Sequence, residues 1–287
     1  MTTERRLSVL TDSNYARDLA ALVKYCDLHG LEDWTALDSQ HIRSFAAHCH
    51  AKGLAPRSIQ RRLSAVRGFY EFLIRQKVIP RRNPASEVRA PKSNRRLPET
   101  LDVDQMGRLL AVPKDEGGTV SRDRAVMELL YSSGLRLAEL VGLDVSHLDL
   151  KDRTVRVLGK GRKERIVPVG THAVTALQRW LEDRALVAAP EEPALFVSRT
   201  GQRLSRRSVQ ARVAYWARRQ GVSLRVYPHL FRHSFASHLL ESGGDLRGVQ
   251  ELLGHADIST TQIYTHLDFQ HLARIYDKTH PRARKKA

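Results

Sequence analysis

Cysteine, aromatic residues and long apolar runs are all scarce in this chain of 287 residues. The two cysteines, Cys26 and Cys49, stand on the apolar faces of expected helices, which favours small core residues in a reducing compartment. No apolar run approaches the roughly 20 residues that a transmembrane helix needs. The opening residues MTTERRLSVLTD lack the apolar segment of a signal peptide, so we expect a cytoplasmic protein.

Acidic residues are also few. The chain has 31 Asp and Glu against 48 Lys and Arg, a net charge of +17. Residues 1–90 carry a net charge of +6 and the remainder +11, so the basic excess is not confined to a tail. Such an excess suits a polyanion such as DNA better than a small metabolite, although an ordinary basic surface would give the same count.

The N-terminal part has the apolar spacing of a helical bundle. We expect helices over 13–29, from Asp38-Ser39 to Gly53, and from Pro56 onward, and a short fourth helix after Asn83-Pro84. The helix that begins at Pro56 carries basic residues on its polar face. We predict that this face binds DNA rather than only water, and its candidate contacts are Arg57, Arg61 and Arg62.

Residues 91–100 read as an interdomain linker, because they contain two prolines and no apolar periodicity. We therefore expect an N-terminal helical DNA-binding domain over 1–90 and a second domain over 101–287. The linker composition permits two basic domains to close around a duplex as a clamp.

The second domain is predicted to be mainly helical with a small β-sheet. Helices are expected after Asp102, over 121–133 with Gly134 as the stop, and over 171–187. The segments 153–158 and 164–169 have the pattern of strands and flank a Gly-Lys-Gly turn at Lys160, which predicts a β-hairpin. Lys160 on its own could be an ordinary exposed turn residue.

A second arginine-rich helix is expected over 205–220. It combines an apolar stripe with several arginines, and it is our candidate for a helix in the major groove of DNA. The candidate contacts on it are Arg206, Arg207 and Arg212. The sequence does not tell which of them would read bases and which would bind phosphates.

The most informative stretch runs from His229 to Tyr264. His229 and Arg232 lie three residues apart and share a helix face, where they could hold one anion. A Leu-Gly-His segment ending at His255 follows, and Tyr264 comes nine residues later. The absence of a nearby carboxylate cluster points to chemistry on a phosphate and to no metal. The pair His229 and His233 could suggest zinc, but two further ligands are lacking.

This order of motifs resembles the active-site block of the tyrosine recombinases, the lambda-integrase family. Two upstream features extend the resemblance over nearly the whole chain. Gly134-Leu135-Arg136, followed by Glu139-Leu140, resembles the first arginine motif of the family, and Lys160 matches the hairpin lysine. The resemblance implies an N-terminal core-binding domain and a C-terminal α+β catalytic domain that together clamp DNA.

The resemblance also implies roles for individual residues. Tyr264 would attack the scissile phosphate and form a 3′-phosphotyrosyl link. Arg136 and Arg232 would stabilise the charge of the transition state. Glu139 would be a buried partner that orients Arg136, although the Arg136–Glu139 pair alone could be a surface ion pair of little value.

The remaining roles concern protons. The resemblance assigns Lys160 as the general acid for the 5′-oxygen, His229 as the proton acceptor for Tyr264, and His255 as a hydrogen-bond donor to the phosphate. No cofactor, metal or ATP is implied. The segment after Tyr264 would pack on the next protomer, although an ordinary terminal helix would have a similar pattern.

The implied substrate is double-stranded DNA with a dif-like recombination site. The implied partner is a second recombinase of the family in a cyclic heterotetramer that converts chromosome and plasmid dimers to monomers at cell division. A septal DNA translocase is a further candidate partner. The rivals are the partner recombinase of the same pair, an integron or phage integrase, a type IB topoisomerase and a non-enzymatic architectural DNA-binding protein.

Overall fold

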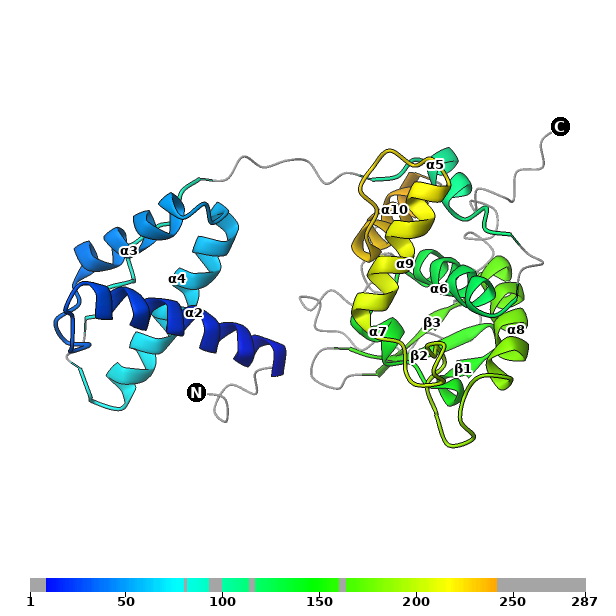
Figure 1. The fold of residues 1–287 in the computed structure, drawn as a ribbon, viewed down its shortest axis with the longest axis horizontal. Coiled ribbons are helices and arrows are strands. Elements are labelled where there is room, and N and C mark those ends of the chain that lie inside the picture. Colours follow the sequence, from blue (N-terminus) through cyan, green and yellow to red (C-terminus); the bar gives the residue numbers. More distant parts are fainter. Residues whose placement is uncertain (1–8, 80–81, 93–99, 114–116, 160–163, 242–287) are drawn as a thin grey trace. The chain divides into compact units, whose positions relative to one another are not determined.

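The computed structural model describes residues 9–79, 82–92, 100–113, 117–159 and 164–241 (Figure 1). The chain divides into two compact units between Leu97 and Pro98. This division lies inside the segment 91–100 that reads as a linker in the sequence. Each unit has a hydrophobic core of its own.

The described residues of the N-terminal unit form three helices: α2 (Val9–Leu28), α3 (Ser39–Ala51) and α4 (Pro56–Arg75). Helix α4 packs against both α2 and α3 (Figure 1). The Asp38 carboxylate caps α3 by accepting from the backbone N–H groups of Gln40 and His41. The three helices predicted from the sequence are confirmed, with α2 starting earlier than expected.

The prediction of a short helix after Asn83-Pro84 is wrong. Residues 84–87 form a turn, because the Asn83 side chain accepts from the backbone N–H of Ala85 at 3.0 Å. The guanidinium of Arg67 donates to the carbonyls of Ala85 and Val88. These contacts satisfy the backbone groups without helical hydrogen bonds.

A buried carboxylate joins two helices of this unit. Asp18 on α2 is fully buried, and it pairs with Arg61 at 2.5 Å and with Arg62 at 3.4 Å. Both arginines lie on α4, more than 40 residues further along the chain. Because a buried charge is costly without partners, Asp18 fixes the position of α2 on α4.

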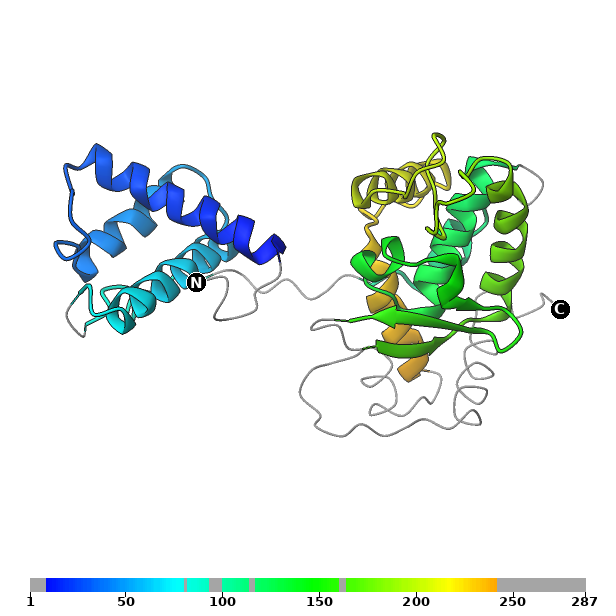
Figure 2. The ribbon, with the colours of Figure 1, turned by 90° about the horizontal axis from the view of Figure 1, so that it is seen from below.

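The C-terminal unit is built around helix α6 (Thr119–Ser133), whose residues 121–133 are all buried. Helices α8 (Thr171–Ala185), α9 (Arg206–Arg219) and α10 (Pro228–Glu241) pack on it (Figure 2). The shorter helices are α5 (Val103–Leu109), α7 (Leu137–Val141) and a 3-10 turn, η1 (Val145–His147).

The sheet has three antiparallel strands in the order β1 (Leu148–Asp149), β2 (Thr154–Leu158) and β3 (Glu164–Pro168). Val155 pairs with Val167, and both are buried. Leu158 pairs with Glu164, so β2 and β3 form the arms of a hairpin. The two strands and the hairpin predicted from the sequence are therefore confirmed.

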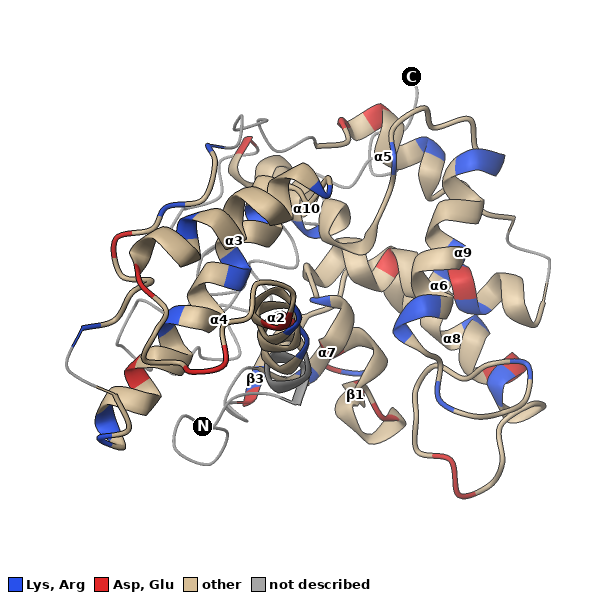
Figure 3. Cartoon of the chain, turned by 60° about the vertical axis from the view of Figure 1, so that its left-hand side comes forward, with Lys and Arg blue, Asp and Glu red and all other residues tan. Residues whose placement is uncertain are grey.

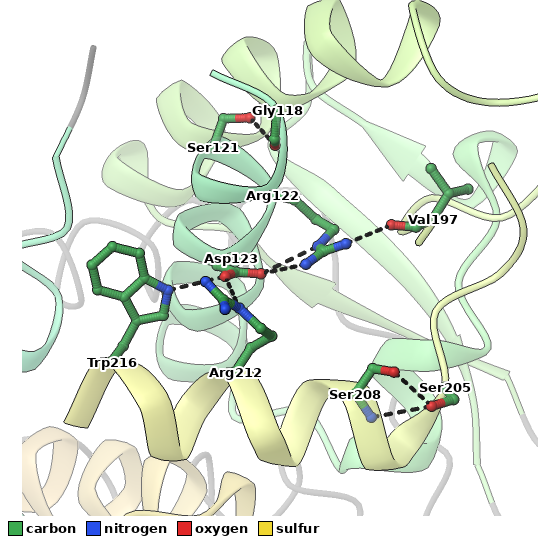
Figure 4. Close-up of polar contacts among 9 residues, drawn as sticks. All are labelled: Gly118, Ser121, Arg122, Asp123, Val197, Ser205, Ser208, Arg212 and Trp216. Carbon is green, nitrogen blue, oxygen red and sulfur yellow. Dashed lines mark hydrogen bonds and ion pairs between the residues drawn. The ribbon is translucent and has the colours of Figure 1, made fainter. Parts of the chain in front are cut away.

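A second buried carboxylate holds α9 on α6 (Figure 4). Asp123 on α6 accepts from Arg122 through one oxygen, and through the other from Arg212 at 2.5 Å and the Trp216 indole at 3.0 Å. Arg122 also donates to the carbonyl of Val197. The Arg212 guanidinium lies 4.3 Å from the centroid of the Tyr215 ring.

The described elements are mostly helices with one small sheet, as the sequence predicts. Figure 3 marks lysines and arginines in blue, and they recur along α4 and α9. Within the part of the chain that the structure describes, no helix combines the length and the apolar character needed to cross a membrane.

We predict that Asp18→Asn destabilises the N-terminal unit by about 1–3 kcal/mol, because it leaves two arginines without their carboxylate partner. The estimate is below that for a fully buried pair because Arg61 is 43% exposed. Chemical denaturation of the full chain would measure the loss. Asp27→Asn is the control, because Asp27 is exposed on the same helix. Equal effects of the two changes would contradict the structural role of Asp18.

Candidate active site

The site begins where α6 ends. Gly134 closes the helix in the left-handed conformation, with φ of +56°. Its carbonyl accepts a 2.8 Å hydrogen bond from Nη1 of Arg232 on α10. Arg232 is only 8% exposed, so its guanidinium is held at the C-terminal end of the central helix. Carbonyls at a helix C-terminus favour such a cation.

The next turn of the chain places Arg136 and Glu139. Arg136 is the N-cap of α7, and Glu139 is the third residue of that helix. The Glu139 carboxylate accepts from the backbone N–H of Arg136 at 2.8 Å and from Arg136 Nη1 at 3.0 Å. The pair is therefore a capping contact at a helix start, and the role of Glu139 in orienting Arg136 for a phosphate stays a prediction.

A third arginine, Arg165, completes this arrangement. It lies on β3 and donates from Nη1 and Nη2 to the two oxygens of Glu139, at 2.8 and 3.0 Å. The Glu139 side chain is 4% exposed, and it receives four hydrogen bonds from two arginines. This carboxylate joins the start of α7 to strand β3.

The charges in the site favour an anion. Burial alone would raise the pKa of Glu139, but the hydrogen bonds from Arg165 and Arg136 outweigh it and lower the pKa, so the carboxylate stays ionised. Burial and the nearby Arg136 lower the pKa of Arg232 to about 10, which still leaves it charged at neutral pH. Two arginines thus contact the carboxylate and a third feels its charge, so the cluster carries net positive charge.

His229 lies one turn before Arg232 on α10. Burial, followed by the charges of His233, Arg232 and Arg136, lowers its pKa. A neutral imidazole at neutral pH can accept a proton. The structure thus brings Arg136, Glu139, His229 and Arg232 into one electrostatic cluster.

Helix α10 is held from the side opposite to this cluster by two polar contacts. The Ser234 hydroxyl accepts from the backbone N–H of Leu101 at 2.9 Å. The Tyr131 hydroxyl and Nδ1 of His238 share a buried hydrogen bond of 2.8 Å. Both contacts fix the helix that carries His229 and Arg232 against α6 and the start of α5.

Three predicted catalytic residues, Lys160, His255 and Tyr264, lie outside the described residues. The strands before and after Lys160 in the sequence are described, and Arg165 follows Lys160 by five positions. The roles of all six predicted catalytic residues remain predictions. Among the described residues, no three His, Cys, Asp or Glu side chains form a group able to hold a metal ion.

The six predicted DNA contacts fall into two groups. Exposed side chains without a described ion pair are those of Arg57, Arg206 and Arg207. The other three pair with buried carboxylates: Arg61 and Arg62 with Asp18, and Arg212 with Asp123. The internal pairs give these three a structural role that the helical pattern does not reveal, and their contact with DNA stays a prediction.

Sequence reasoning missed Arg165, although a signal for it exists. In β3 the side chains alternate, so Arg165 shares its face with the buried Val167, while Glu164 and Ile166 are exposed. An arginine on the inner face of a strand needs an acidic partner. The sequence does not identify that partner as Glu139, which lies 26 residues earlier.

Family models match both units of the chain. The model of the phage integrase family matches residues 99–271, and that of the phage integrase N-terminal SAM-like domain matches residues 1–77. The chain belongs to the phage integrase family. The resemblance seen in the sequence is thereby confirmed, and this chain is a tyrosine-type, site-specific DNA recombinase.

Individual integrase-family proteins are similar over nearly the full length. Tyrosine recombinase XerC of Salmonella typhi is 53% identical over 282 residues, which cover 98% of this chain and 93% of that protein. A crystal structure of XerA recombinase is 27% identical, with a TM-score of 0.53 and coverage of 100% and 96%. The XerH recombinase bound to difH, before cleavage, has a TM-score of 0.71 at 24% identity and coverage of 94% and 80%.

We predict that the integrase-family catalytic unit loses stability as the pH falls below about 6.5, the pKa of an unfolded histidine. Burial lowers the pKa of His238 in the folded state. Between the unfolded and the folded pKa, the unfolded chain therefore binds a proton that the folded chain does not. The loss continues until the pH reaches the folded pKa. In His238→Asn this contribution disappears, and the unfolding temperature should fall less between pH 7 and 5. Calorimetry of both proteins would test this, and identical pH dependences would contradict it.

Proposed function

We propose that this chain is a XerC-like site-specific recombinase. It acts with a XerD-like partner in a cyclic heterotetramer on double-stranded DNA with paired dif-like sites. The reaction converts chromosome and plasmid dimers to monomers before cell division. The identity of 53% to a XerC protein over 98% of the chain supports this assignment. The enzyme works in the cytoplasm on the nucleoid, and a septal DNA translocase is its candidate regulator.

The two basic units bind the duplex from two sides, as a clamp. Residues 1–90 serve as the core-binding domain, 91–100 as the linker and 101–287 as the catalytic domain. The net charge of +17 supports phosphate binding along both units. The exposed arginines Arg57, Arg206 and Arg207 are the foremost candidates for DNA contact.

The observation that carries the proposal is the cluster of Arg136, Arg232 and His229. Two guanidinium groups held in place by Glu139 and by the Gly134 carbonyl are prepared for an anion before it arrives. They bind the non-bridging oxygens of the scissile phosphate, where negative charge grows in the transition state. Loss of either arginine costs on the order of 3–4 kcal/mol, or a few hundredfold in rate.

The proposed bond changes are those that the family resemblance implies. The Tyr264 oxygen attacks phosphorus, the bond from phosphorus to the 5′-oxygen breaks, and a 3′-phosphotyrosyl link forms. His229 takes the phenol proton, Lys160 gives a proton to the leaving 5′-oxygen, and His255 donates a hydrogen bond to the phosphate. The link conserves the bond energy, so a 5′-hydroxyl of another strand can attack it and rejoin the DNA without ATP or a metal.

We predict that a nicked suicide DNA with a dif-like site traps the wild-type protein as an adduct that survives denaturation. The assay contains the XerD-like partner and no metal, and the adduct is scored on a denaturing gel. Tyr264→Phe should bind the DNA and form no adduct, because it lacks the attacking hydroxyl. Tyr276→Phe is the matched control, which removes a phenol at another position in the C-terminal segment.

Each result of this assay separates the rivals. An adduct in Tyr264→Phe would overturn the assignment of the nucleophile. Binding without an adduct in the wild type would favour an architectural DNA-binding protein. Relaxation of supercoiled DNA without strand exchange or a partner would favour a type IB topoisomerase, and recombination of integron or phage sites would favour another integrase.

The segment after Tyr264 is proposed to pack on the neighbouring protomer and to couple assembly to placement of the nucleophile. We predict that deletion of 268–287 leaves DNA binding largely intact and weakens partner-dependent cleavage. Gel shift and adduct formation, measured on the same DNA with and without the partner, would test this. Unchanged cleavage by the truncated protein would show that the segment only completes its own domain.

A further inference from the structure

We propose that Arg165 is a positioning residue for the recombinase reaction and acts on Arg136 through Glu139. The inference rests on the proposed function in one respect, namely that Arg136 binds the scissile phosphate. It adds a residue that lies outside the six predicted catalytic positions. It also gives strand β3 a role in the arginine cluster.

The geometry of the carboxylate supports this role. Arg165 donates in parallel from its two terminal nitrogens, at 2.8 Å to Oε1 and at 3.0 Å to Oε2 of Glu139. Such a fork-to-fork pair fixes both the position and the plane of the carboxylate. Without it, the terminal torsion of a glutamate has broad minima and permits rotation of the carboxylate.

The plane of the carboxylate in turn determines the direction of Arg136. Oε2 accepts from the backbone N–H of Arg136, and Oε1 accepts from its Nη1. Each oxygen of Glu139 therefore receives one bond from Arg136 and one from Arg165. If Arg165 no longer holds the carboxylate, the two oxygens that accept from Arg136 can move. The Arg136 guanidinium then loses its orientation towards the phosphate.

Arg165 also connects two parts of the catalytic unit. It is the second residue of β3, five positions after Lys160 in the sequence, whereas Glu139 lies in α7. The pair therefore ties the hairpin arm to the helix that Arg136 caps. Because the Arg165 side chain is 18% exposed and that of Arg136 is 37% exposed, Arg136 is the more accessible of the two to a phosphate.

The test uses Arg165→Gln, which removes the charge and the fork, and Arg165→Lys, which keeps the charge but cannot donate two parallel bonds. The matched control is Arg156→Gln, because Arg156 is exposed on β2 and pairs with Ile166, next to Arg165. The single-turnover rate of adduct formation on saturating nicked DNA is measured for each, and the DNA affinity is measured separately.

We expect Arg165→Gln to lower the cleavage rate about 10- to 100-fold, the scale of a small misplacement of a catalytic group. Arg165→Lys should show most of this loss, and Arg156→Gln should not. Affinity for DNA should be unchanged in all three. A loss of affinity in Arg165→Gln, or full activity in Arg165→Lys, would overturn the positioning role.

A double-mutant cycle with Glu139→Gln tests the path through the carboxylate. If Arg165 acts only through Glu139, adding Arg165→Gln to Glu139→Gln should cause little further loss. If the two losses add in full, Arg165 acts on the DNA or on the fold by another route, and the inference fails.

A readout without DNA keeps this inference distinct from the proposed function. The Arg136 backbone N–H should exchange with solvent slowly in the wild type and in Arg156→Gln, and faster in Arg165→Gln, while amides of α6 stay protected. Unchanged exchange of the Arg136 amide would overturn the inference. If that exchange changes but the wild type forms no adduct, the positioning contact stands and the proposed function fails.

Discussion

The catalytic unit depends on one buried carboxylate, that of Glu139. It accepts hydrogen bonds from Arg136 and Arg165, and so joins the start of α7 to strand β3. A buried anion with fewer partners would be unstable or would take up a proton. With two arginines it remains ionised, yet it offsets only part of their charge. The arrangement therefore orders the arginines and still leaves a cationic site for a phosphate.

The second arginine of the cluster is held by the backbone of the same region. Arg232 donates to the carbonyl of Gly134, two residues before Arg136, so the two guanidinium groups are positioned from one short segment at the end of α6. Further along α10, the hydrogen bonds of His238 to Tyr131 and of Ser234 to Leu101 hold the helix in place. Since residues 121–133 of α6 are all buried, the cluster lies at the end of a buried helix, which favours preorganised binding of charge.

The sequence predicts most of the local structure, because helices, caps and the hairpin follow from short-range patterns such as Pro56, Gly134 and the strands around Lys160. The family resemblance, and not the spacing alone, groups Arg136 with His229 and Arg232, whose charges influence one another in the structure. The sequence does not predict long-range partners. Arg61, placed on a DNA-facing surface by its helical position, pairs with an aspartate 43 residues away. Periodicity shows which face a residue takes, but not the charge that it meets there.

The same logic explains how so basic a chain folds. Three buried carboxylates each pair with two arginines, and at least one arginine of each pair lies on another element. They are Asp18 with Arg61 and Arg62, Asp123 with Arg122 and Arg212, and Glu139 with Arg136 and Arg165. A scarce acidic residue that is buried between two cations reduces their repulsion more than an exposed one, whose field water and salt screen. The interior thus uses the few acids to join elements. The surface keeps its excess of positive charge, which a DNA-binding enzyme needs.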